Sequence, residues 1–266
     1  MTESEHYPRR APDFAEVEEE QPRRLRWLLW LLALGVAAAM LVTAITRMLL
    51  PGSISWGSGL ILGDGYVLTC EHVVQNGETF TVYWDGRAYE AEVIETSRSE
   101  DLALLEVEEL DGEGLPWSRW RVLGPGDVVV AVGYPAGSPR SVSISGEVLR
   151  VGASAMVPGD VRLENVVLVH GAYEGGMSGA PVVNMWGEVV GLVSGTLAEG
   201  NGAGIGLAVS ADAARRWLAG IAPEVDLGEG ETGERLELSQ VANATGEVAV
   251  RLEVTPGLLD AQEPNP

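Results

Sequence analysis

The sequence has no lysine, one cysteine and three histidines among its 266 residues. A single cysteine, Cys70, excludes an intramolecular disulfide and a metal site built from several cysteines. Three histidines leave little room for a histidine-rich zinc site, so we expect no metal and no other cofactor. The 17 basic residues are all arginine, and 39 acidic residues bring the net charge to −22. Because binding of phosphates needs basic patches, nucleic acid is not an expected partner.

The longest stretch without a charged residue runs from Trp27 to Thr46. As a helix, a stretch of this length spans roughly 30 Å, the thickness of the hydrocarbon core of a bilayer. Three arginines lie just before it, and Arg47 is the only basic residue close behind it. The positive-inside rule then predicts a cytoplasmic N-terminus and an exported remainder, in the periplasm or at the cell exterior. The alternative is a signal peptide cleaved after Ala37–Ala39; the apolar run continues past these alanines, which favours an uncleaved anchor.

Composition divides the chain into four segments. Residues 1–24 are polar, rich in glutamate and interrupted by prolines, which predicts a disordered cytoplasmic tail. Residues 25–50 contain the predicted transmembrane helix. Residues 51–222 are expected to form the folded domain, and residues 223–266 an acidic C-terminal tail. Within that tail, Glu247–Val254 is a candidate for one added strand.

The predicted domain consists of short runs of β-branched and aromatic residues between glycine-rich turns. Asp85-Gly86 is a strong signal for a two-residue hairpin. Many short strands with regular turn signals are typical of an all-β barrel or sandwich. The main predicted strands are residues 56–62, 66–69, 79–84, 87–95, 128–132, 142–151, 161–169, 182–184 and 188–193.

One helix is predicted near the end of the domain. Ser210 is suited to cap its N-terminus, and Asp212 lies in its first turn, where a negative charge is favourable. Arg215 and Arg216 follow, and Gly220 is suited to end the helix. The domain is therefore expected to be all-β with one short C-terminal helix.

A glycine-rich turn surrounds Ser178 in the segment Glu174–Val183. Glycine permits backbone conformations and close approaches that other residues do not. Such a turn can expose the serine hydroxyl and direct backbone N–H groups to a point beside it. Acyl transfer needs this combination of a nucleophile and donors for the developing negative charge. Ser178 is therefore the candidate nucleophile.

A serine nucleophile needs a general base, and the three histidines are the candidates. His6 lies across the predicted membrane from Ser178, and His170 lies at the end of a strand. His72 directly follows a strand, where a barrel loop begins. No histidine follows Ser178, which excludes an α/β-hydrolase, whose histidine comes last. Asp101 precedes an apolar strand between His72 and Ser178, and completes the order histidine, aspartate, serine of chymotrypsin-like enzymes.

The motifs of the domain resemble, in order and spacing, those of HtrA/Deg-type serine proteases of the chymotrypsin clan. The resemblance implies two antiparallel six-stranded β-barrels with the active site in the cleft between them. It covers nearly all of residues 51–222. The matching segments are Gly57–Leu62, Asp64–Thr69, His72–Val74, Asp101–Leu105, Val130–Pro135 and Gly204–Val209.

The resemblance also implies a role for each candidate. Ser178 is the nucleophile, His72 the acid and base, and Asp101 the carboxylate that orients His72. The backbone N–H groups of Gly176 and Ser178 form the oxyanion hole. Ser194 corresponds to a family residue near the aspartate.

Three positions bear on specificity and on loop geometry. Ala172 and Tyr173 occupy the floor and wall of the primary substrate pocket in the family. Neither is charged, so we expect cleavage after small or medium apolar residues. Met177 stands where the family commonly has asparagine or aspartate, so the oxyanion loop is expected to be held differently.

The expected protein is a membrane-anchored serine endopeptidase acting on proteins or peptides outside the cytoplasm, in protein quality control or regulated proteolysis. A catalytically silent protease fold kept for binding is the main alternative, with Met177 marking a degraded oxyanion loop. Hydrolysis of small esters on the same barrels is a third. The 44 residues after Ala222 are too few for a PDZ domain, so peptide-activated regulation is not expected. Assembly into a homo-oligomer is left open.

Overall fold

The computed structural model describes residues 54–118, 123–157, 160–171, 173–197, 204–230 and 233–256. They belong to the second of two compact units, which spans residues 51–266. Within these ranges no helix has the length and apolar character needed to cross a membrane. The predicted tail and transmembrane helix of residues 1–50 lie outside the described residues.

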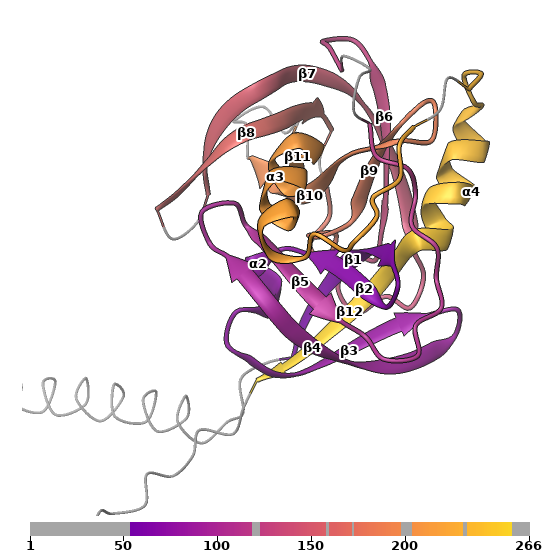
Figure 1. Cartoon of the computed structure of the whole chain (residues 1–266). Coiled ribbons are helices and arrows are strands. Elements are labelled where there is room, and N and C mark those ends of the chain that lie inside the picture. The colour runs from indigo at the N-terminus through magenta and orange to yellow at the C-terminus, as the bar shows by residue number, and fades with distance from the viewer. Residues whose placement is uncertain are drawn as a thin grey trace, which may run out of the picture. The chain divides into compact units, whose positions relative to one another are not determined.

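The described strands close into two barrels, each of six antiparallel strands (Figure 1). The first has the strand order β1-β12-β3-β4-β5-β2, and the second β10-β11-β8-β7-β6-β9. The strands are β1 Ser55–Gly63, β2 Tyr66–Thr69, β3 Gly77–Trp84, β4 Arg87–Ser97, β5 Leu102–Glu106, β6 Val128–Gly133, β7 Val142–Val157, β8 Val161–His170, β9 Pro181–Asn184, β10 Val189–Leu197, β11 Ile205–Ser210 and β12 Ala249–Pro256. The helices are α2 Glu71–Val74, α3 Ala211–Ile221 and α4 Leu238–Val248.

The predicted mostly β architecture is confirmed, and the strands named from the sequence begin within two residues of their observed starts. The hairpin turn between β3 and β4 has φ of +46° at Asp85 and +72° at Gly86. Two consecutive positive φ angles are typical of the turn that matches the twist of antiparallel strands. The largest boundary difference is in β7, which continues to Val157 rather than ending at Val151.

The predicted helix after β11 is also confirmed. It is α3, and the Ser210 hydroxyl accepts a hydrogen bond from the N–H of Ala213 at 3.2 Å. Ala213, Ala214 and Leu218 are buried on one side of this helix. A capped helix with one apolar face packs on the surface of the barrels without disturbing their interiors.

Side chains fill the interior of both barrels. Leu60, Leu68 and Leu104 in the first barrel are completely buried, as are Val182 and Val193 in the second. Removing this apolar surface from water is the main force that closes the barrels. The barrels therefore support the candidate functional residues His72, Asp101 and Ser178, which lie in the helical turn α2, at the start of β5 and in the loop before β9.

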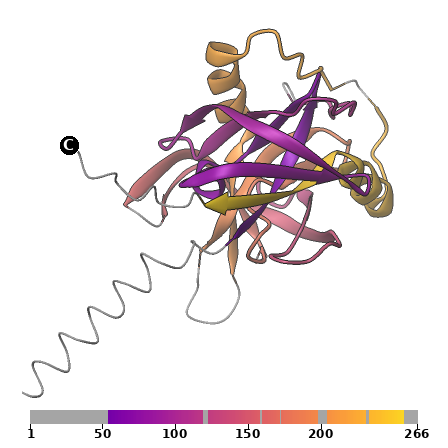
Figure 2. The same ribbon diagram turned by 90° about the horizontal axis from the view of Figure 1, so that it is seen from below.

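The C-terminal strand β12 inserts between β1 and β3 of the first barrel (Figure 2). Val250 and Leu252 are completely buried there. On the other face of β12, the guanidinium of Arg251 lies 5.0 Å from the ring centre of Trp56 on β1 and 4.0 Å from that of Tyr83 on β3. The candidate strand Glu247–Val254 is therefore confirmed as β12. The folded domain does not end at Ala222, because the first barrel closes only when β12 is added.

The helix α4, which precedes β12, packs against β6 and β9 of the second barrel. Its buried residues Val241, Thr245 and Val248 follow helical spacing. The side chains of Glu237 and Gln240 form a capping box at its start. The C-terminal segment thus contacts both barrels, and in Figure 1 it runs as one yellow path from the second barrel into the first. Neither helix nor cap was predicted.

Candidate active site

His72 lies on α2, a single helical turn that directly follows β2. The next two residues, Val73 and Val74, are buried. Val73 packs so closely on β1 that a Cβ at Gly57 would lie 2.4 Å from its Cγ1. This packing holds the turn against the first barrel and leaves the imidazole at the surface, with 45% of its side chain exposed.

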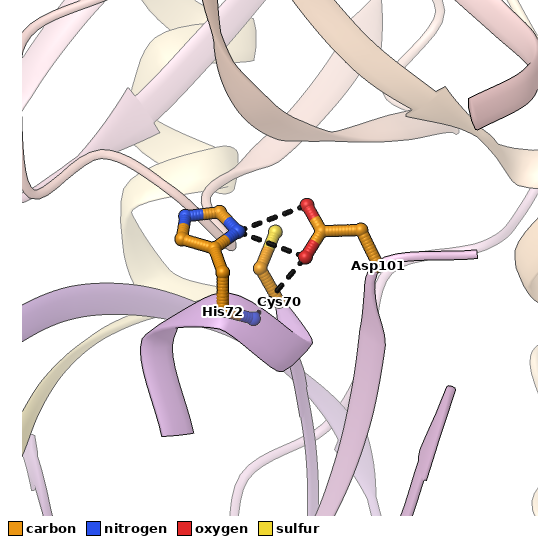
Figure 3. A group of neighbouring side chains, drawn as sticks. All are labelled: Cys70, His72 and Asp101. Atoms are coloured by element: carbon orange, nitrogen blue, oxygen red, sulfur yellow. Dashed lines mark hydrogen bonds and ion pairs between the residues drawn. The ribbon is translucent and has the colours of Figure 1, made fainter. Parts of the chain in front are cut away.

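Asp101 lies at the start of β5 and is 4% exposed. Its φ of +53° is uncommon for a residue other than glycine. Oδ1 lies 2.8 Å and Oδ2 3.0 Å from Nδ1 of His72 (Figure 3). The backbone N–H of His72 also donates to Oδ1, at 3.2 Å. Asp101 therefore holds both the main chain and the ring of His72.

The pKa of His72 lies above its ordinary value of 6.5. Burial of the ring opposes this rise, because it disfavours the charged imidazolium. The hydrogen bond to Asp101 and the charges of Asp101 and Glu71 outweigh burial and stabilise the protonated ring. With Nδ1 directed at Asp101, Nε2 is the nitrogen left to exchange a proton with another group.

Ser194 connects Asp101 to Ser178. The hydroxyl of Ser194, on β10, donates to Oδ2 of Asp101 at 2.5 Å, so the predicted position of Ser194 near the aspartate is confirmed. Its carbonyl accepts a hydrogen bond from Oγ of Ser178 at 3.3 Å. Among the hydrogen bonds of the described residues, none joins Ser178 to His72. Catalytic hydrogen bonds are often loose before substrate binds.

Two glycines shape the loop around Ser178. Gly176 has a φ of +93°, and a Cβ there would lie 2.3 Å from the backbone nitrogen of Ala136. Gly179 has a φ of +89°, and a Cβ there would lie 2.1 Å from the carbonyl oxygen of Ser58. No other residue type fits either position, since both the backbone angle and the space exclude a side chain.

Along this loop, backbone N–H groups that donate a hydrogen bond alternate with N–H groups that are free. Those of Met177 and Gly179 donate to Glu174 O at 3.1 Å and to Val193 O at 2.7 Å. Those of Gly176 and Ser178 donate to no acceptor within the described part of the chain. Two free N–H groups beside a serine hydroxyl are the arrangement that stabilises an oxyanion.

Ser58 on β1 holds the same loop, a role that the sequence analysis did not assign. Its hydroxyl donates to the carbonyl of Gly176 at 2.9 Å and accepts from the N–H of Tyr134 at 2.8 Å. Its own N–H donates to the carbonyl of Ser178 at 2.8 Å. The only indication of this role in the sequence is that a small polar residue lies between Gly57 and Gly59 in an otherwise apolar strand.

Met177 is completely buried in the core of the second barrel. Its Cε would lie 3.5 Å from a Cβ at Gly133 on β6. An apolar side chain therefore anchors the loop, in place of the polar residue common in the family that the sequence resembles. The loop still leaves the N–H groups of Gly176 and Ser178 free of internal acceptors.

Tyr173 is 9% exposed, and burial raises its pKa. Its ring lies against Gly206, where a Cβ would meet its Cε2 at 2.5 Å. Thr196 holds its main chain through hydrogen bonds of 2.8 and 3.0 Å. Ala172, the other residue predicted in the primary pocket, lies outside the described residues.

A cavity of about 270 Å³ opens beside the histidine. His72, Asp101 and Ser194 are among its lining residues, which come from both barrels. The remaining lining residues are Glu71, Gln75, Arg98, Val157, Val161, Gly195, Thr196, Leu197 and Leu207. The cavity gives a ligand direct access to the imidazole and the carboxylate.

Cys70 lies beneath His72 and Asp101 and is completely buried. Its thiol donates to the carbonyl of Val193 at 3.2 Å. Burial, the charge of Asp101 and a hydrogen bond with Asp101 raise the pKa of the thiol well above its ordinary value. The sulfur is therefore a neutral thiol and not a nucleophile.

Comparison with known proteins agrees with this geometry. Residues 57–192, just over half of the chain, match the family model of the trypsin-like peptidase domain. The chain belongs to this family. The peptidase domain contains the hydrogen-bonded pair His72 and Asp101 and the glycine-framed Ser178. His170, the other histidine of the described residues, is exposed at the end of β8.

Curated relatives of the domain include HtrA/Deg-type proteases. It is 30% identical to the serine endoprotease DegS of Haemophilus influenzae over 205 residues, which cover 75% of this chain and 59% of that protein. It is also 30% identical to the periplasmic serine endoprotease DegP of Escherichia coli over 182 residues, covering 66% of this chain and 38% of that protein. The chain thus spans less than two thirds of these relatives.

Solved structures with the same fold include proteases of similar length. The active form of the Rv3671c protease of M. tuberculosis is 26% identical with a TM-score of 0.58, over 67% of this chain and 79% of that one. The serine endoprotease of Yersinia pestis is 26% identical with a TM-score of 0.54, over 67% of this chain and 65% of that one. The arrangement of strands is therefore that of known serine proteases.

Proposed function

We propose that this chain is a serine endopeptidase of HtrA/Deg type that cleaves proteins or peptides through an acyl-enzyme. The observation that carries the proposal is the hydrogen-bonded pair of His72 and Asp101, which Ser194 connects to Ser178 and its two free backbone N–H groups. Asp101 accepts from Nδ1 of His72 at 2.8 Å, which leaves Nε2 as the base. This is the division of roles found in serine proteases with a catalytic triad.

Catalysis begins when the Ser178 hydroxyl leaves the carbonyl of Ser194 and turns its proton toward Nε2 of His72. Oγ then attacks the scissile carbonyl, and His72 takes the proton. The negative charge that forms on the carbonyl oxygen is stabilised by the N–H groups of Gly176 and Ser178; one such donor contributes about 10²–10³ in rate. His72 protonates the leaving amine, and water releases the acyl group with His72 again acting as base.

Asp101 holds the imidazole in the tautomer with the proton on Nδ1 and stabilises the cation that forms. Ser194 in turn holds Asp101, through its hydrogen bond to Oδ2 at 2.5 Å. Two barrels thus contribute to one site: the first supplies His72 and Asp101, and the second supplies Ser178 and Ser194.

The proposed specificity is for small or medium apolar residues before the cleaved bond. The ring of Tyr173 supports this proposal, because it occupies the space beside Gly206 and carries no charge. Ala172 is expected to be the floor of the same pocket. A panel of fluorogenic peptides that differ only at this residue tests the proposal, and fastest cleavage after arginine would contradict it.

The proposed location is the membrane, with the N-terminus in the cytoplasm and the peptidase domain in the periplasm or at the cell exterior. The uncharged segment Trp27–Thr46 and the arginines before it support this. The substrates are then extracytoplasmic proteins, in quality control or regulated proteolysis. Alkaline phosphatase fused behind the last residue is expected to be active, since this reporter folds only outside the cytoplasm. An inactive fusion of normal abundance would place the domain inside.

A second candidate is a catalytically silent binding module. The observation in its favour is the hydrogen bond of Ser178 to Ser194, because a hydroxyl held there does not face the base. The two functions are distinguished by incubating the full-length protein with a fluorophosphonate probe and with unfolded casein, with Ser178→Ala as control. Labelling and cleavage confined to the unmutated protein establish the peptidase. A folded protein that is unlabelled at every pH would establish the silent module.

A further inference from the structure

We propose that Cys70, His72 and Asp101 form an inhibitory site for a zinc-type divalent cation. The cation binds the Cys70 sulfur, Nδ1 of His72 and one carboxylate oxygen of Asp101, and it stops the peptidase by changing which ring nitrogen carries a proton. The inhibitory effect rests on the proposed function. The binding of the cation does not depend on it and is tested separately.

The geometry of the three side chains carries this inference. One ligand atom from each residue lies within 4.8 Å of the other two. Figure 3 shows the three side chains converging, with the sulfur facing the gap between the ring and the carboxylate. Zinc lies about 2.3 Å from sulfur and about 2.0–2.2 Å from nitrogen or oxygen, so two of its ligands stand roughly 3–4 Å apart. Small side-chain movements therefore bring the three atoms to one ion.

The chemical nature of the ligands selects the ion. Thiolate, imidazole and carboxylate together suit Zn²⁺ and its heavier analogue Cd²⁺, whereas Mg²⁺ and Ca²⁺ prefer oxygen alone. Three protein ligands leave one position of a tetrahedral ion for water. That water can reach the ion through the cavity lined by His72 and Asp101.

The charges and protons balance in this site. On binding, the Cys70 thiol releases its proton to solvent, since a bound cation deprotonates a coordinating thiol. The thiolate and the Asp101 carboxylate then carry two negative charges, which the divalent cation neutralises. A neutral group of ions is less costly to bury than a lone carboxylate. His72 stays neutral but moves its proton from Nδ1 to Nε2.

The position of that proton explains the inhibition. A histidine whose Nδ1 holds a metal ion has no lone pair on Nε2, so it cannot accept the proton of Ser178. The ion also takes the place of the hydrogen bonds of 2.8 and 3.0 Å between His72 and Asp101. The same cation thus blocks the base and removes the group that orients it.

Binding is tested on the full-length Ser178→Ala protein, which keeps all three ligands and is inactive by design. Cd²⁺ is added, and the ultraviolet charge-transfer absorbance of a cadmium thiolate is followed. Cys70 is the only cysteine of the chain, so any such band reports on it. We expect a band that saturates at one equivalent. A folded protein that shows no band overturns the proposal.

Inhibition is tested with Zn²⁺ on the active protein, each variant being compared with its own metal-free rate. Cys70→Ala, with Cys70→Ser as a second variant of similar size, is expected to weaken inhibition at least about 100-fold, because loss of an outer-sphere partner alone costs about 10–100-fold. His170→Ala is the matched control and should leave inhibition unchanged. Equal inhibition of the unmutated protein and both Cys70 variants overturns the proposal. If the protein shows the cadmium band but has no peptidase activity, the proposed metal site stands and the proposed function is refuted.

Discussion

The hydroxyl of Ser58 donates a 2.9 Å hydrogen bond to the carbonyl of Gly176 and so connects β1 of the first barrel to the Ser178 loop of the second. Ser58 is completely buried, and its hydroxyl also accepts the N–H of Tyr134. The carbonyl of Gly176 and the N–H of Met177 belong to one peptide unit. Holding this carbonyl therefore fixes the peptide plane that lies between the N–H groups of Gly176 and Ser178.

Replacing Ser58 with alanine leaves the carbonyl of Gly176 and the N–H of Tyr134 without this partner. We expect kcat to fall about 10²–10³-fold through disturbance of the oxyanion donors, while KM changes little. Each buried group left unsatisfied also costs about 1–3 kcal/mol of unfolding free energy. Steady-state kinetics and thermal unfolding measure the two effects. Ser55→Ala, at an exposed position of the same strand, is the control, and equal behaviour of the two variants would refute the role of Ser58.

Gly176→Ala and Gly175→Ala form a matched pair. An added methyl at Gly176 would lie 2.3 Å from the nitrogen of Ala136 at a φ of +93°, whereas at Gly175 it would meet nothing within 4 Å. We expect Gly176→Ala to lower the rate of fluorophosphonate labelling by at least about 10²-fold, since the oxyanion donor is displaced. Gly175→Ala should label within a few-fold of the unmutated protein. Similar losses in both variants would refute the specific effect of the close backbone approach at Gly176.

Asp101→Asn removes the charge opposite His72 and favours the wrong tautomer of the ring. We expect kcat to fall about 10⁴-fold with a smaller change in KM. Glu100→Gln, the neighbouring carboxylate, is the control and should retain most of the activity. Cleavage of a fluorogenic peptide measures both. A loss below about 10-fold in Asp101→Asn would show that Asp101 does not orient the base.

The raised pKa of His72 sets the pH dependence of the reaction. Because only the neutral ring can accept the Ser178 proton, kcat/KM is expected to rise with pH through a midpoint above 6.5. In Asp101→Asn the hydrogen bond and charge that raise the pKa are lost, so the midpoint of the residual activity moves to lower pH. If the unmutated protein and Asp101→Asn show the same midpoint, a group other than His72 controls the rise of kcat/KM with pH.

The same raised pKa affects stability with a defined sign. Protonated His72 is favoured in the folded protein, so its contribution is fully present below pH 6.5 and is lost as the pH rises through the folded pKa. His72→Gln should therefore lower the melting temperature more at acidic than at alkaline pH. A larger loss at alkaline pH would contradict the assigned direction.

Leu252→Ala tests the contribution of the C-terminal strand to the first barrel. Leu252 is completely buried between β1 and β3, so its truncation should lower the unfolding free energy by about 2–5 kcal/mol. Thr255→Ala, at an exposed position of the same strand, should stay within about 0.5 kcal/mol. Denaturant unfolding compares the two. Equal stability of both variants would show that β12 is dispensable for the barrel.

Much of the site was predictable because it depends on short-range order along the chain. The absence of a histidine after Ser178 left His72 as the base, and the apolar run after Asp101 marked the carboxylate at a strand start. Turn residues such as Asp85-Gly86 set the strand boundaries, because their backbone angles are a local property. The roles of Ser178, His72 and Asp101 remain predictions that the kinetic experiments test.

Apart from the contact of Ser194 with Asp101, which the family resemblance implied, contacts between distant segments were not predictable from the sequence. The alternation of apolar and polar residues in Ala249–Pro256 indicates a strand, but it does not show that this strand fits between β1 and β3. Ser58 gave no sign that it bonds a loop 118 positions away. Tyr173 and Met177 became buried because the second barrel had space for them beside Gly206 and Gly133.

The order of residues in the sequence therefore determined which side chains can act in catalysis and which local turns expose them. Tertiary packing decided how those groups are held, because hydrogen bonds and buried apolar contacts between the barrels form only when both have closed. Cys70 illustrates the difference. In the sequence it is a single cysteine with no partner, and in the folded protein its sulfur lies within 4.8 Å of a ring nitrogen of His72 and a carboxylate oxygen of Asp101.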